Sequence, residues 1–314
     1  MICRKWNEIT NEKMDLIHED FDILIVGDNV NIDERSSFLH NQFITKNRNI
    51  LKFFIKINEQ NNKLLINIYK NGSEERLQDL AQIMSEYIAH NILIDMTTFD
   101  VPSLSYLIDS IHKHVNNFTI CYIEPKGYKK KGQAVPREND VSYYLSEDGN
   151  SLEYVSPFIP NIGSKITKYF ISLGYESYRL AGFLESDEIE TQAEINVVFG
   201  IPAFNLGWEN HSIDNNYSFL NSLAKELSIY TIPADDPIQI YMKLTEVLRS
   251  LKPRNRAIES IVLVPLGTKP QALGMIWFAI NNKNNVGLIY DFVKKIPNRT
   301  QGINKIHLWS FKSV

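Results

Sequence analysis

The sequence lacks the features that mark several classes of protein. It contains only two cysteines, Cys3 and Cys121, which show neither metal-binding spacing nor a disulfide framework. No apolar run approaches the ~18 residues of a membrane-spanning helix, and the start of the chain does not resemble a secretory signal peptide. We therefore expect a cytoplasmic protein with no membrane contact.

Recognisable catalytic signatures are also missing. There is no Gly-x-Ser-x-Gly elbow, no His-Glu-x-x-His pair and no glycine spacing of a Walker A loop. His112 and His114 flank Lys113 on a predicted helix and point to different faces, which argues against a shared metal ion. The sequence thus predicts no metal site and identifies no cofactor.

Composition and charge indicate an ordinary globular protein. Apolar residues make up 44% and charged residues 22% of the 314 residues, a length sufficient for two domains. The formal net charge of −4 argues against a surface built mainly to bind nucleic acid. Local contact with nucleic acid remains open.

Apolar, β-branched runs alternate with stretches of helical period along most of the chain. This alternation is typical of an α/β fold in which parallel strands are joined by helices. The runs predict strands at residues 23–26, 51–57, 63–69, 92–95, 118–123, 169–173, 195–199, 229–232, 261–264 and 286–290, and an antiparallel edge strand at 306–311. Helices are expected at residues 36–43, 75–90, 101–115, 180–187, 217–227, 237–251 and 270–281.

The pattern falls into two series, which predict two Rossmann-like lobes with mostly parallel sheets. The expected organisation is an N-terminal lobe at residues 1–125, a linker with a β-hairpin at 126–162, and a C-terminal lobe at 163–314. Both series begin with a strand, a glycine, an arginine and a helix in that order. An internal duplication and the ordinary likeness of α/β patterns both explain this order.

The most informative segment is the apolar run ending at Pro265, followed by Gly267, Thr268 and Lys269 and then a helical pattern. At such a junction, backbone N–H groups, a hydroxyl and an ammonium can converge on a phosphate or carboxylate. The alternative is ordinary capping, with Thr268 as the N-cap and Pro270 in the first turn. A lysine in the first turn opposes the helix dipole, which favours a ligand.

This strand, Gly-Thr-Lys and helix resembles the ligand loop of CARF- and SAVED-type Rossmann-like nucleotide sensors, which bind cyclic oligonucleotides in prokaryotic defence. The resemblance covers residues 262–279, and Pro265 and Leu266 stand where those families often have a small residue. It implies that Gly267, Thr268 and Lys269 contact a nucleotide-like anion.

A second candidate site follows the predicted strand at 195–199. The loop after it carries Gly200, Trp208 and Asn210, which can approach, stack on and hydrogen-bond a base. The alternative is an aromatic plug on the surface of the lobe. Glu209 and His211 lie beside Trp208, and we retain both as candidate acid/base residues.

Further polar candidates follow other strands. Asp291 and Arg299 follow the strand at 286–290 and are expected at the same sheet edge as Thr268, where Asp291 is also a catalytic candidate. The alternative is a solvated charged loop. In the first lobe, the strand at 92–95 ends in the candidate ligand residues Asp95, Thr97 and Thr98.

These patterns favour a nucleotide-sensing or regulatory subunit, with prokaryotic antiviral defence as its setting by resemblance. The expected partners are a nucleotide-like small molecule and a protein partner or second copy. A nucleotide or NAD hydrolase is one alternative. The other is an assembly subunit that contacts protein or nucleic acid without a small ligand.

Overall fold

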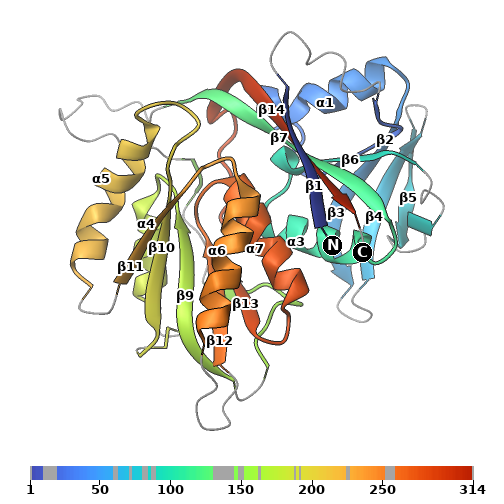
Figure 1. Cartoon of the computed structure of the whole chain (residues 1–314). Helices are drawn as coiled ribbons and strands as arrows, with labels where there is room; N and C mark the ends of the chain where they lie inside the picture. The colour runs from blue at the N-terminus through green and yellow to red at the C-terminus, as the bar shows by residue number, and fades with distance from the viewer. Residues whose placement is uncertain are drawn as a thin grey trace. The chain divides into compact units, whose positions relative to one another are not determined.

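The computed structural model of the chain describes residues 2–9, 20–58, 63–70, 73–79, 84–85, 90–129, 145–147, 152–161, 164–186, 189–190, 192–223, 227–251 and 259–312. The chain divides into two compact units, residues 1–129 with 297–314 and residues 130–296. Each contains one β-sheet with helices (Figure 1), so the predicted α/β class with two Rossmann-like lobes is confirmed. Within the described ranges, no helix is long and apolar enough to span a membrane.

The first unit contains an eight-stranded sheet whose order is β1-β14-β7-β6-β2-β3-β4-β5. The central strands β7, β6, β2 and β3 are parallel, and the strands on both sides of them are antiparallel. The elements are β1 (Ile2–Ile9), β2 (Ile23–Val26), α1 (Glu34–Thr45), β3 (Asn49–Asn58), β4 (Lys63–Lys70), β5 (Ser73–Asp79), β6 (Ile92–Asp95), the 3-10 turn η2 (Met96–Thr98), α3 (Val101–Ile111), β7 (Asn117–Tyr128) and β14 (Thr300–Lys312).

The second unit contains a six-stranded sheet whose order is β11-β10-β9-β12-β13-β8. All its pairs are parallel except β13 with β8. Chain order reverses between β9 and β12, which is where ligands bind in open α/β sheets. The elements are β8 (Glu153–Tyr154), β9 (Lys165–Leu173), α4 (Ser177–Leu184), β10 (Glu194–Gly200), α5 (Trp208–Asn221), β11 (Leu227–Ile232), α6 (Pro237–Ser250), β12 (Glu259–Pro265), α7 (Lys269–Asn281) and β13 (Val286–Tyr290).

The expected boundaries of the C-terminal lobe and the linker are wrong at their ends. Strand β14 pairs antiparallel with β1 and β7 and so belongs to the sheet of the first unit, inside the sheet rather than at its edge. Residues 126–128 end β7 and are not part of a linker. Local periodicity identifies a strand but not the sheet that it joins, because partners far apart in sequence decide the pairing.

The predicted hairpin is not formed by those of its residues that the structure describes. Residues 141–144 and 151 lie outside the described residues. The remainder pairs elsewhere: β8 pairs with β13, and Ser146 forms a bridge with Lys295. Residues 145–147 and 152–161 therefore belong to the second unit.

Helices α6 and α7 show why local sequence produces these elements. Asp236 accepts hydrogen bonds from the N–H groups of Ile238 and Gln239, which begins α6. Helix α7 is buried along almost its whole length, and Gly274 lies where a Cβ would be 2.3 Å from the carbonyl oxygen of Pro237. This glycine permits close packing of α7 on α6.

Two helices were predicted at the wrong residues. The expected helix at 75–90 includes β5, which pairs with β4. The expected helix at 217–227 begins earlier, at Trp208, and ends at Asn221. Its N-cap is Gly207, in a left-handed conformation that favours glycine.

The two units share a strand order. In the first, β3-β2-β6-β7 lie side by side, and in the second β10-β9-β12-β13 follow the same order relative to the chain. Helices α1 and α4 follow the equivalent strands β2 and β9, and α3 and α7 follow β6 and β12. Gly27 and Gly174 are also equivalent, because a Cβ at either would lie 2.7 Å from a carbonyl oxygen, of Thr98 and Leu266 respectively. These correspondences support an internal repeat.

Candidate functional site

The candidate site is the carboxyl edge of the second sheet, where β9 and β12 end side by side. The loops after these strands are in direct contact: the N–H of Gly267 donates to Ser172 Oγ at 3.1 Å. A Cβ at Gly174 would lie 2.7 Å from the carbonyl oxygen of Leu266. Glycine is thus required for this close approach.

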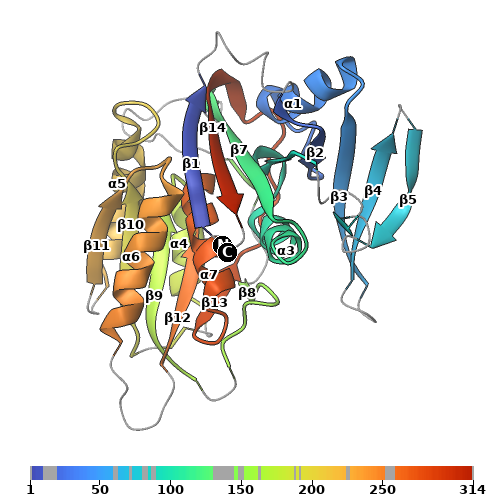
Figure 2. The same cartoon turned by 45° about the vertical axis from the view of Figure 1, so that its right-hand side comes forward.

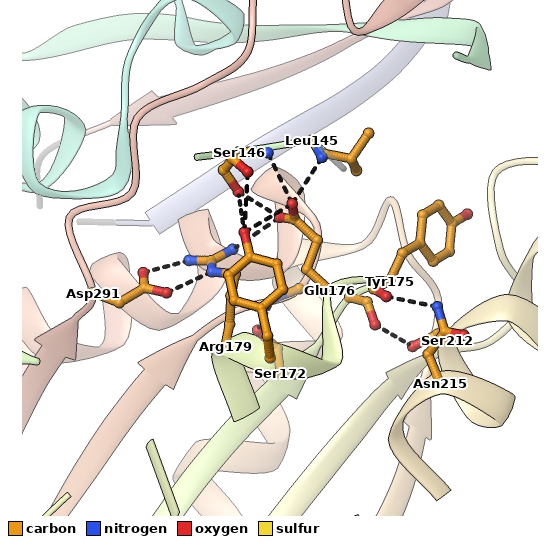
Figure 3. Close-up of polar contacts among 12 residues, drawn as sticks. Leu145, Ser146, Ser172, Tyr175, Glu176, Arg179, Ser212, Asn215 and Asp291 are labelled. Carbon is orange, nitrogen blue, oxygen red and sulfur yellow. Dashed lines mark hydrogen bonds and ion pairs between the residues drawn. The ribbon is translucent and has the colours of Figure 1, made fainter. Parts of the chain in front are cut away.

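The loop at residues 174–176 is held in place by helix α5. Ser212 Oγ and Asn216 Nδ2 donate to the carbonyl oxygen of Gly174 at 3.0 and 2.9 Å. Asn215 Nδ2 donates to the carbonyl oxygen of Tyr175 at 2.7 Å, as Figure 3 shows. Three side chains from one helix therefore fix the conformation of the loop.

The same loop ends in Glu176, whose side chain is almost completely buried. Its carboxylate accepts from the N–H groups of Leu145 and Ser146, both at 2.8 Å, and from Ser146 Oγ at 2.6 Å. The Tyr178 hydroxyl donates to it at 3.0 Å. Burial first, and then the nearby Glu176 carboxylate, raise the pKa of Tyr178.

Arg179 and Asp291 form a bidentate ion pair beside Glu176 (Figure 3). Both contacts are 2.6 Å, and each side chain is only 8% exposed. Burial by itself would lower the pKa of the Arg179 guanidinium, but Tyr290 and Asp291 raise it above its ordinary value. Asp291 is therefore committed to this pair, which disfavours its predicted roles in catalysis and ligand binding.

An aromatic group lies next to the loop. The ring of Tyr175 meets those of Trp208 and His211 edge-on, with centroids 6.5 and 6.0 Å apart. All three side chains are partly exposed. Glu209 Oε2 accepts from the N–H of Gly207 at 3.1 Å, and Asn210 is exposed on α5. The structure thus brings Trp208 and His211 to Tyr175, which the sequence analysis missed.

The Gly267, Thr268 and Lys269 segment adopts the geometry of a capped helix. Thr268 is the N-cap of α7 and forms a capping box with Gln271, and its hydroxyl donates to the carbonyl oxygen of Ala234. Lys269 is the first helical residue and is partly exposed. Helix capping thus explains the presence of Thr268 without a ligand. Lys269 has no role in this capping and stays a candidate for binding an anion.

Gln271 links the start of α7 to the end of β11 and was not identified from the sequence. It is fully buried, it caps the backbone of Thr268, and its Nε2 donates to the carbonyl oxygen of Ile232 at 3.3 Å. A Cβ at Gly200 would lie 3.1 Å from Ala234 Cβ. The available signal was a glutamine three residues after Thr268, the spacing of a capping box.

Arg299 does not belong with these residues. It lies in the first unit, where its carbonyl oxygen accepts from the N–H of Lys129 at 2.9 Å, immediately before β14. The expectation that it lies at the same sheet edge as Thr268 is therefore wrong. The reason is again that β14 pairs with β7 rather than with the second sheet.

In the first unit, the candidates at the end of β6 have structural partners. Asp95 is fully buried and accepts from the N–H of Thr97 at 2.9 Å. Thr97 Oγ1 accepts from the N–H of Ile123 at 3.0 Å, and Thr98 Oγ1 accepts from the N–H of Gly27 at 2.7 Å. These bonds tie the segment after β6 to β7 and to the residue that follows β2. In the described ranges, no group of His, Cys, Asp or Glu side chains is placed to hold a metal ion.

The first unit also has an arginine equivalent to Arg179. Arg35, in the first turn of α1, donates to Asp33 at 3.3 Å, to the Tyr122 hydroxyl at 3.2 Å and to a β7 carbonyl. Burial opposes ionisation of Asp33, but Arg35 and the hydroxyl of Thr300 hold its pKa below the ordinary value. In both units, a buried arginine thus ties the first helix to a tyrosine of the equivalent strand, β7 or β13.

Comparison with known proteins gives no family assignment. No family model matches the chain, and no curated protein matches it significantly.

Proposed function

We propose that the second unit binds an anionic, nucleotide-like ligand at the carboxyl edge of its sheet and that the protein acts as a sensing or regulatory subunit. The observation that carries this proposal is the loop at residues 174–176, which lies where chain order reverses between β9 and β12. Its carbonyl groups are fixed by α5, so its backbone is preorganised before a ligand arrives.

The side chains around this loop fit the chemistry of a nucleotide. Tyr175 and Trp208 offer partly exposed aromatic rings on which a base can stack. Lys269, in the first turn of α7, supplies a positive charge beside the helix N-terminus, where an anion is favoured. The setting in prokaryotic antiviral defence rests on the resemblance of residues 262–279 to the ligand loop of CARF and SAVED sensors.

A regulatory role is supported by the connection from this loop to the segments that join the units. Glu176 accepts from the backbone N–H groups of Leu145 and Ser146, and residues 145–147 pair with residues 294–296. The chain passes from the second unit to the first between residues 296 and 297. A ligand that displaces the loop would therefore alter the joining segments.

A hydrolase is the second candidate function, favoured by the position of Glu209 and His211 in the first turn of α5. His211 lies against Tyr175, and Glu209 is partly exposed beside Gly207. A carboxylate and an imidazole next to a base-stacking surface can serve as general acid and base.

The test is mass spectrometry of small molecules released from the native protein, followed by titration with each nucleotide identified. The matched variants are Lys269→Ala and Lys283→Ala, because Lys283 follows the other end of α7. Binding that Lys269→Ala weakens and Lys283→Ala leaves unchanged would support the site. Turnover lost in Glu209→Gln would favour the hydrolase, and a failure of nucleotides and NAD to bind would contradict the proposal.

A further inference from the structure

Strand β11 is an outer strand of the second sheet (Figure 2) and, among the described residues, pairs only with β10. It runs over Leu227–Ile232 and contains no charged residue, proline or glycine. Its pairing with β10 is regular, with no bulge. It thus presents an uncharged strand edge with β-branched residues.

An edge of this kind requires an explanation, because proteins protect exposed edge strands with charge, proline or bulges. The outer strands of the first sheet follow this rule in their sequences: β1 includes Arg4 and Lys5, and β5 includes Glu74 and Glu75. At the other end of the second sheet, β8 covers β13. Among the residues that the structure describes, β11 has none of these protections.

Exposed apolar side chains occur on β11 and on the helices that precede and follow it in the chain. Among the described residues, few large apolar side chains are exposed, yet three of them lie on consecutive elements. Tyr217 on α5 is 63% exposed, Ile229 on β11 is 55% exposed, and Met242 on α6 is 59% exposed. Ile229 thus adds an exposed apolar side chain to the uncharged outer strand.

We infer that β11 is a dimer interface, on which a second copy of the chain pairs its own β11 antiparallel across a two-fold axis. In a two-fold pair whose axis is perpendicular to the sheet, residues on the same face must oppose each other. Centring the axis on Ile229 places the Ile229 side chains of the two copies opposite each other. Leu227 then faces Thr231, and Ser228 faces Tyr230. The two sheets become one continuous sheet.

The occupant is a second copy rather than an extended peptide for two reasons. The uncharged strand is complementary to itself, because no like charges oppose each other at any position of the pair. A strand of six residues also buries less area than the roughly 800 Å² per partner of a stable interface. A folded copy can add area from α5 and α6, the helices that flank β11 in the chain, whereas a lone strand cannot.

The test is the molar mass in solution, measured by light scattering and sedimentation at micromolar concentrations. We expect twice the 36.3 kDa of one chain. Ile229→Lys brings two like charges together and should raise the dimer Kd by on the order of a hundredfold. The control is Ile159→Lys, which changes a side chain with nearly the same exposure, 54%, in the loop before β9. Circular dichroism establishes that both variants are folded.

A crosslink tests the register independently. Opposed residues in an antiparallel pair have Cβ atoms about 4.5–5.5 Å apart, within reach of a disulfide after slight adjustment. Oxidised Ile229→Cys should therefore form a covalent dimer, and Ile159→Cys should not. A monomeric wild-type chain, or a dimer that persists in Ile229→Lys, would overturn the inference. These outcomes do not depend on nucleotide binding, so they leave the proposed function to its own test.

Discussion

Replacement of Asp291 by alanine should destabilise the second unit rather than abolish ligand binding. The change removes the carboxylate in bidentate contact with Arg179 and leaves a guanidinium that is 8% exposed. Glu176 is 4.0 Å from Arg179 and is already engaged by residues 145 and 146, so it compensates poorly. Breaking a buried pair costs about 3–5 kcal/mol because one charge remains without its partner.

The cost can be measured as a thermal shift and as a free energy. For a unit of this size, the expected loss corresponds to a fall in midpoint of roughly 6–20 °C. Arg179→Met combined with Asp291→Leu removes both charges, and it should recover most of the stability because neither charge is left buried. A folded Asp291→Ala variant with wild-type stability and lost binding would refute this reasoning and restore Asp291 as a ligand residue.

The other predictions concern the site and the first unit. Lys269→Ala should weaken nucleotide binding and cost less than ~0.5 kcal/mol in urea unfolding, since a partly exposed lysine is removed; unchanged binding would reduce Lys269 to a helix-start residue. Trp208→Ala should lose about 1–3 kcal/mol of affinity by calorimetry, whereas unchanged affinity with a loss of about 3–5 kcal/mol of stability would identify a plug. Because the pKa of Asp33 is lowered when folded, its stabilisation is present above its ordinary value of 3.8 and lost as pH falls below it. Asp33→Asn should therefore flatten the acid side of the stability profile, and an unchanged slope would contradict this.

The sequence predicted strands and loop positions well where burial leaves a local pattern. Strands β2, β6 and β13 occupy the predicted residues, because parallel strands buried on both faces read as continuous apolar runs. The start of α7 was also predictable, since a threonine three residues before a glutamine is a capping signal. Helix α5 was misplaced because Asn215 and Asn216 lie inside it, where they donate to carbonyl groups of the loop after β9.

What the sequence determined by itself is the α/β class, the strand-to-helix junction at Thr268 and the presence of two series of elements, because each depends on residues close together in the chain. Only the tertiary structure decided that β14 returns to the first sheet and that Arg179 pairs with Asp291, 112 residues further on. It also placed Tyr175 beside Trp208. Strand order and the burial of charge determine which strands and side chains pair over such distances. Neither produces a periodic pattern in the sequence.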